Sequence, residues 1–241
     1  MKFKNPITPF NVNDPREVGI KYLIFRNLMP LKYLERLRLL LLGSGAYFTP
    51  AFDSTKSIFI HIPKAAGTSV SKAFYGGRQG HHTAIALKCA NESKFSSFYK
   101  FSIVRNPYSR LYSTYNYLLK SPHLEDSQWA KDNIAHFENF NEFVCSWVTT
   151  ENIHSWKHFL PQVYFLCDSE GTILVDDVGK LENIDAIFST VSAKLGFEGV
   201  LPEENVMGKV EKGYRNFYLP EAIKVVKDVY AEDLKMFDYE F

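Results

Sequence analysis

Residues 57–70 read SIFIHIPKAAGTSV, and this stretch decides the fold. Residues 58–62 form a nearly continuous apolar run rich in β-branched side chains, which is typical of a strand buried on both faces in a parallel sheet. Pro63 has no N–H group to donate and therefore ends the ladder. Apolar residues then recur at helical spacing from Val70 onward. The stretch predicts a strand, a tight loop of small residues and a helix, in that order.

The loop between this strand and helix has the composition of an anion site. Free N–H groups at a helix N-terminus point toward the preceding loop, and the helix dipole adds partial positive charge. Gly67 permits close approach of the backbone, Thr68 and Ser69 add hydroxyl donors, and Lys64 adds a full charge. We interpret the loop as a phosphate or sulfate cradle. The alternative is an ordinary βα turn with Lys64 on the surface and Thr68 as the N-cap.

The cradle differs from a standard nucleoside-triphosphate loop. In the Walker pattern the lysine follows the last glycine, whereas Lys64 precedes Gly67. A P-loop kinase or nucleotide hydrolase keeps some support from residues 173–176, which look like a strand ending in a metal-binding carboxylate, Asp176. A second alternative is a non-catalytic module that binds acidic glycans or lipid surfaces through a basic N-terminal segment.

A second informative stretch, residues 101–113, reads FSIVRNPYSRLYS. Arg105 follows a predicted strand and precedes a helix for which Asn106 is a good cap. A guanidinium at the carboxyl edge of an α/β sheet can bind a phosphate through two parallel hydrogen bonds, and Ser113 can add a hydroxyl. The residues alone leave open whether Arg105 binds a ligand or makes a structural ion pair. Arg110 is interpreted as pairing with a carboxylate on the helix surface.

Composition indicates a globular chain without a strong overall charge. The 241 residues are 46% apolar and 15% aromatic, and the net charge is +1. These values exclude a disordered polymer and give no argument for nucleic-acid binding. Basic residues gather in residues 1–42, which hold eight Lys or Arg against three Asp or Glu.

Cysteine usage and hydropathy predict the compartment. Cys89, Cys145 and Cys167 are odd in number and lack metal-ligand spacing, which indicates reduced thiols. No segment reaches the roughly 18 to 20 apolar residues that a membrane span needs. We therefore expect a soluble, cytoplasmic protein in preference to one of the Golgi lumen.

Predicted strands and helices alternate, without repeats or a linker, which indicates a single α/β domain. We place a basic N-terminal arm with helices at residues 1–50, packed on a domain at residues 51–241. Besides the first strand, strands are predicted at residues 100–104, 163–167 and 172–175. Helices are predicted at residues 107–120, 141–148, 184–195 and 220–236. Residues 121–133 are predicted to be a surface loop.

Together the two stretches resemble the sulfotransferases that use 3′-phosphoadenosine 5′-phosphosulfate, with the closest likeness to the carbohydrate branch that modifies glycosaminoglycans. The motifs are P-K-x-x-G-T-S and, about forty residues later, V-R-N-P-Y-x-R-L-x-S. The likeness continues in HFLPQ at residues 158–162 and VGKLEN at residues 178–183, and it covers about residues 57–241. The resemblance implies a P-loop-like domain with a central, mainly parallel sheet flanked by helices.

The resemblance also implies roles for individual residues. The 3′-phosphate of the donor would be held by Arg105 and Ser113. His81 matches the histidine that the family often carries between the cradles, so it is the expected catalytic base, with His82 next; the alternative is an exposed histidine pair. Lys64 would oppose charge growing on the leaving phosphate, so no metal is required. The 5′-phosphosulfate would be held by Lys64, Ala65, Ala66, Gly67, Thr68 and Ser69.

The implied reaction is in-line transfer of a sulfuryl group to a hydroxyl of a carbohydrate, which can be polyanionic, leaving 3′-phosphoadenosine 5′-phosphate. A histidine near its unperturbed pKa can take the hydroxyl proton at neutral pH. His158 and Trp156 are candidates for the sugar site, and packing around Pro161 is the alternative. The family pattern is broken at Met207, where Ser or Thr is expected. That departure affects the adenine and 3′-phosphate contacts expected from Lys209, Lys212 and Arg215.

Overall fold

The computed structural model describes residues 47–202 and 213–241. The expected N-terminal helices and the contacts expected from Lys209 and Lys212 lie outside these residues. Arg215 is exposed, and its guanidinium lies 4.8 Å from the ring centre of Tyr214. No helix in the described parts of the chain is long and apolar enough to cross a lipid bilayer.

A parallel sheet of three strands organises the described chain. Its order is β1 (Ser57–Ile60), β2 (Tyr99–Val104) and β3 (Asp177–Lys180), and Phe59 pairs with Phe101, which pairs with Asp177. The first two strands confirm the sequence prediction, because both are short apolar runs that the sheet buries. The carboxyl ends of all three strands meet at one edge, where α/β proteins bind ligands.

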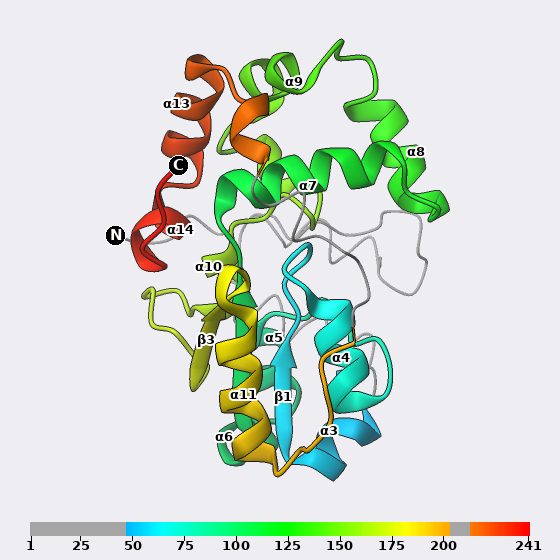
Figure 1. Ribbon diagram of the computed structural model, residues 1–241, viewed down its shortest axis with the longest axis vertical. Coiled ribbons are helices and arrows are strands. Elements are labelled where there is room, and N and C mark those ends of the chain that lie inside the picture. The colour runs from blue at the N-terminus through cyan, green and yellow to red at the C-terminus, as the bar shows by residue number, and fades with distance from the viewer. Residues whose placement is uncertain (1–46, 203–212) are drawn as a thin grey trace.

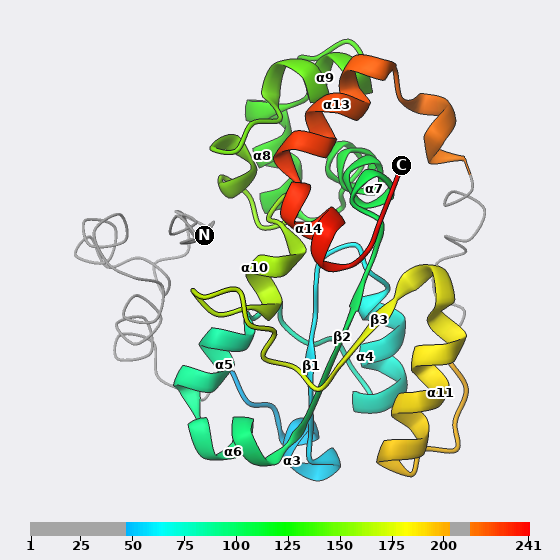
Figure 2. The same cartoon turned by 90° about the vertical axis from the view of Figure 1, so that its left-hand side faces the viewer.

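Helices cover both faces of the sheet and confirm the predicted α/β class. Figure 2 shows α4 and α11 on one face and α5 and α6 on the other. The bounds of the helices around the sheet are α3 (Pro50–Thr55), α4 (Gly67–Tyr75), α5 (Ala84–Ala90), α6 (Glu92–Ser97), α10 (Gln162–Leu166), the short η3 (Leu181–Asn183) and α11 (Ile184–Leu195). Their apolar faces and the strands form one hydrophobic core.

A second, helical layer lies beyond the carboxyl edge of the sheet. Figure 1 shows α7 crossing above the tip of β1, with α8, α9 and α13 beyond it. This layer has its own core, which is rich in aromatic rings. Its helices are α7 (Pro107–Leu119), α8 (Leu124–Asn133), α9 (Phe140–Trp147), η2 (Asn152–His154), η4 (Tyr214–Phe217), α13 (Pro220–Val229) and α14 (Ala231–Met236).

Two predicted strands are wrong. Residues 162–166 form α10, because the buried Asp233 carboxylate accepts hydrogen bonds from the backbone N–H groups of Gln162 and Val163 and so caps a helix start. Residues 172–175 make only an isolated bridge, between Cys167 and Ile173, and the third strand begins at Asp177. A short apolar run does not distinguish a buried strand from a buried helix.

Two further predictions need correction. The predicted loop at residues 121–133 contains α8, which is polar because much of it faces solvent, although Asp126 and Ala130 are buried. The predicted helix at residues 220–236 is divided into α13 and α14 at Tyr230, whose hydroxyl donates to the Phe159 carbonyl. The helices predicted at residues 107–120, 141–148 and 184–195 are confirmed by α7, α9 and α11.

Candidate functional site

The loop between β1 and α4 has an unusual backbone. Lys64 and Ala66 have φ angles of 66° and 56°, in the left-handed region that non-glycine residues rarely occupy. Where left-handed residues alternate with residues of negative φ, successive backbone N–H groups point into one concavity, which can bind an anion. No described side chain caps α4, so Thr68 is not its N-cap. The first-turn N–H groups of this nine-residue helix therefore remain directed at the loop.

Position 67 has room only for glycine, because the ring of His61 lies against it. A Cβ atom at Gly67 would overlap Cδ2 and Nε2 of His61. The His61 ring is buried, and its Nδ1 donates to the carbonyl of Gln79 at 2.8 Å. Burial lowers the pKa of His61 to about 4, so the ring is neutral at pH 7.

Replacement of Gly67 by alanine is therefore expected to destabilise the protein by about 1–3 kcal/mol, the usual cost of inserting a methyl group into a packed site. Urea unfolding measures this change. Gly77→Ala is the matched control, because a Cβ atom there meets nothing within 4 Å. Equal unfolding free energies for the two variants would contradict the packing of His61 on Gly67.

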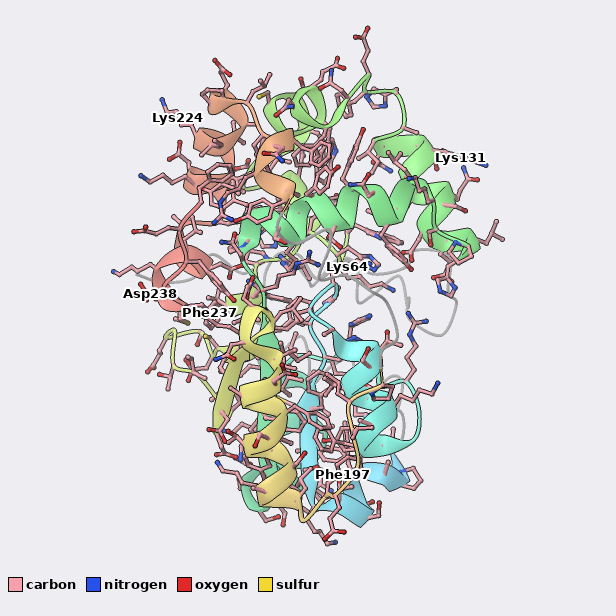
Figure 3. The ribbon with its side chains drawn as sticks, viewed as in Figure 1. Lys64, Lys131, Phe197, Lys224, Phe237 and Asp238 are labelled. Carbon is pink, nitrogen blue, oxygen red and sulfur yellow. The ribbon has the colours of Figure 1, made fainter. Side chains whose placement is uncertain are left out.

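Arg105 connects the second strand-to-helix corner, between β2 and α7, with the first corner, between β1 and α4. Its side chain is buried, its Nε donates to Ser109 Oγ at 2.9 Å, and its Nη1 donates to the Lys64 carbonyl at 3.1 Å. Ser113 is also buried and lies one turn beyond Ser109, on the same face of α7. Lys64 and Arg105 thus lie together between the sheet and α7, and Ser113 is on α7 itself. Figure 3 shows Lys64 there, at the tip of the β1–α4 loop below α7.

Two residues whose roles the sequence did not predict fix the backbone at Arg105 and at the adjacent Asn106. The Gln162 amide accepts from the backbone N–H of Arg105 and donates to its carbonyl, both at 2.8 Å. Glu182 accepts from the backbone N–H of Asn106 at 2.8 Å. These residues belong to the HFLPQ and VGKLEN motifs, so the available signal was the motif and not a property of either residue alone.

The interpretation of Arg110 as a surface residue is wrong. Its guanidinium is buried and donates to the backbone carbonyls of His158 and Leu160. The reason is the position of α7, which lies between the sheet and the other helices of the second layer (Figure 1), so that Arg110 is buried. Arg110 consequently fixes the backbone of His158.

His81 is held in one tautomer. Its Nδ1 lies 2.8 Å from the carbonyl of His61, which can only accept, so we assign the ring proton to Nδ1. Nε2 then carries the lone pair. Burial, ahead of the neighbouring His61, lowers the pKa of His81 well below its usual 6.5, which differs from the nearly unperturbed value expected from the sequence.

The His82 side chain has different neighbours from those of His81. Its ring packs against Tyr47, with ring centres 4.7 Å apart. It does not line either of the cavities described next, whereas His81 lines one of them. The two histidines are therefore in different surroundings, although they are adjacent in sequence.

Two cavities adjoin at this edge of the sheet. One, of about 520 Å³, lies over the first cradle, and the other, of about 670 Å³, lies beside His81. Arg78 and Tyr117 line both, so the cavities are neighbours. The first is lined by Lys64, Thr68, Lys72, Gly76, Gly77, Arg78 and Tyr117. The second is lined by Arg78, Gln79, Gly80, His81, Tyr117, His123, Leu124, Glu125, Asp126, Lys157 and His158.

The two predicted sugar-site residues are neighbours, but only one of them lines a cavity. His158 lines the second cavity, and its Nδ1 lies 3.7 Å from Asp126 Oδ1. Trp156 instead stacks on Trp129 in the aromatic core and donates from Nε1 to Asp126 at 3.2 Å. Trp156 therefore supports the cavity wall from behind.

Positive charge is concentrated around Lys64. Burial, followed by the nearby Arg105 charge, lowers the pKa of the Lys64 ammonium to about 8. A bound anion reverses this shift, because opposite charge favours the protonated amine. Lys64 is thus a cation held where a negative ligand is favoured.

The carboxylate that supported a kinase lies at the wrong end of the sheet. Asp176 immediately precedes β3 and therefore lies at the amino edge. It accepts from the backbone N–H of Lys100 at 2.7 Å and pairs with the Lys100 ammonium at 2.9 Å. The Lys64 loop lies at the opposite, carboxyl edge, so Asp176 cannot assist an anion bound there.

A family model described as the sulfotransferase family matches residues 51–240. No curated protein and no solved structure gave a match. The matched span contains both strand-to-helix corners and the lining of both cavities.

Proposed function

This chain belongs to the sulfotransferase family, and from that premise we propose that it moves a sulfuryl group from 3′-phosphoadenosine 5′-phosphosulfate to a hydroxyl of a carbohydrate. The observation that carries this proposal is the hydrogen bond from Arg105 Nη1 to the Lys64 carbonyl. This bond joins two basic strand-to-helix turns, one after β1 and one after β2. The donor has two separate anionic groups, so each turn can hold one of them.

The residues present fit such a donor. Lys64, Thr68 and the first N–H groups of α4 would hold the 5′-phosphosulfate, in a loop whose left-handed residues form an anion concavity. Arg105 and Ser113 would hold the 3′-phosphate. When bound, the donor supplies the sulfuryl group; the protein supplies position and charge.

The protein's own part in the reaction follows from His81 and Lys64. His81 accepts the proton of the acceptor hydroxyl at Nε2, because Nδ1 is already committed to the His61 carbonyl. Lys64 and the α4 N–H groups oppose negative charge on the leaving phosphate. A metal ion is not needed for either task.

A carbohydrate acceptor is supported by the chemistry of the second cavity. Its lining combines carboxylates, basic side chains and the ring of Tyr117, which suits a ligand with many hydroxyl groups and apolar ring faces. Arg78 and Lys157 also suit an acceptor that carries negative charge. The proposal therefore extends to acidic sugars.

Transfer of labelled sulfuryl groups from the donor to a glycan panel, with EDTA present, tests the proposed function. We expect transfer to at least one glycan, and no phosphoryl transfer from ATP in a parallel assay with Mg²⁺. Failure to label any glycan together with metal-dependent ATP turnover would favour the kinase alternative.

The pH profile of kcat/KM for the donor is expected to be asymmetric. The base form of His81 persists well below pH 6.5 because its pKa is lowered, so the acid limb lies well below that pH. Lys64 loses its charge as pH rises through about 8, so activity falls there. Steady-state rates between pH 5 and 10 measure the alkaline limb and show whether activity falls near pH 6.5. An acid limb centred at pH 6.5, or full activity at pH 10, would contradict these assignments.

A further inference from the structure

Tyr117 contacts both sides of the site. It projects from the last turns of α7 and lines both cavities. On the donor side, the ammonium of Lys64 lies 4.1 Å from the centre of its ring. On the acceptor side, its hydroxyl donates to Asp126 Oδ2 at 2.8 Å. One side chain thus joins the two groups of residues through different atoms.

Asp126 carries this contact on to His158. Its carboxylate is buried, accepts from Tyr117 and from Trp156 Nε1, and lies 3.7 Å from His158 Nδ1. The His158 ring is buried, and its Nδ1 has no hydrogen-bond partner among the described residues. The ring centre of His158 lies 6.2 Å from that of His81. Contacts therefore run from Lys64 through Tyr117 and Asp126 to the ring that faces the proposed base.

We propose that Tyr117 is a positioning residue for both substrates. Its ring holds the Lys64 ammonium at the donor cavity, as expected for a cation near an aromatic face. Its hydroxyl holds Asp126, whose carboxylate lies beside the His158 ring, at the acceptor cavity. This inference rests on the proposed function. It assigns the ring of Tyr117 to the donor and its hydroxyl to the acceptor.

Two substitutions at Tyr117 separate the role of its ring from that of its hydroxyl. Tyr117→Phe keeps the ring under Lys64 and removes the hydroxyl, whereas Tyr117→Leu removes both. Tyr112→Phe is the control on the same helix, because the Tyr112 ring stacks on Phe217 and lines neither cavity. Calorimetry with 3′-phosphoadenosine 5′-phosphate measures the donor side, and the acceptor KM in the glycan assay measures the acceptor side. Thermal unfolding establishes that each variant is folded.

The expected results differ for the two variants. Tyr117→Phe should raise the acceptor KM about tenfold, as for the loss of one hydrogen bond to a charged group, and change the affinity for the bisphosphate less than about twofold. Tyr117→Leu should also weaken that affinity about fivefold or more. Asp126→Asn should reproduce the acceptor defect of Tyr117→Phe, and the double variant should lose little more, because the two residues act as one unit.

The inference is overturned if both Tyr117 variants behave like Tyr112→Phe in an active enzyme, and the proposed function then stands. It is also overturned if Tyr117→Phe weakens the bisphosphate as much as Tyr117→Leu does. Absence of any bisphosphate binding by the unaltered protein overturns the proposed function itself, together with this inference.

Discussion

Substitution of His81 by asparagine is expected to lower kcat for sulfuryl transfer by about 10²–10⁴-fold, the usual contribution of a general base. The asparagine amide can still donate to the His61 carbonyl, so the loop should keep its conformation. It offers no lone pair that takes a proton at neutral pH. Because His81 lies outside the donor cradle, the affinity for 3′-phosphoadenosine 5′-phosphate should stay within about twofold.

Single-turnover rates and calorimetry on the same variant separate these two quantities. His136→Asn is the matched control, since His136 is exposed and its ring packs only on the neighbouring Phe137 among the described aromatic contacts. Unchanged kcat in His81→Asn together with a large loss in His82→Asn would transfer the role of base to His82.

Substitution of Lys64 by methionine is expected to reduce kcat by about 10²–10³-fold, as for other losses of a group aimed at developing charge. It should also weaken binding of 3′-phosphoadenosine 5′-phosphate by about 10–100-fold, the effect of losing a hydrogen bond to a charged group. Methionine preserves the length and apolar stem of the side chain. The change therefore removes charge and little packing.

The comparison variant is Lys72→Met, which removes a charge from the same cavity. Lys72 is exposed, so solvent screens its charge and the cost should be below about tenfold. Equal losses for Lys64→Met and Lys72→Met would mean that the first cradle acts only through its general positive potential. A Lys64 variant with normal binding and turnover would exclude the assigned role.

The elements that were predictable from the sequence depend on neighbours in the chain. β1 and β2 are apolar runs closed by local signals, and α7 begins where Asn106 accepts from the backbone N–H of Tyr108. Adjacency of β1 and β2 then brings Lys64 and Arg105 to one edge. The positions of these residues therefore followed from two local motifs and one rule about parallel sheets.

The elements that were not predictable depend on partners far along the chain. α10 begins where it does because Asp233, about seventy residues later, caps it. Arg105 is fixed by Gln162, and Arg110 is buried because it donates to the backbone carbonyl of His158, nearly fifty residues later. α8 lacks a strong apolar stripe, so its sequence was typical of a loop. Asp126 was missed for the same reason, since it lies on α8, whereas His81 and His158, which line the same cavity, were among the predicted residues.

The most direct test of the two-corner site compares two ligands on the unaltered protein by calorimetry. The first is 3′-phosphoadenosine 5′-phosphate, and the second is adenosine 5′-phosphate, which lacks only the group assigned to Arg105 and Ser113. We predict one-to-one binding of the bisphosphate, with an affinity at least about tenfold higher than that of the monophosphate, as for the loss of charge-assisted hydrogen bonds. Equal affinity for the two ligands, or no binding of either, would contradict a site in which the Lys64 and Arg105 corners hold the two ends of one nucleotide.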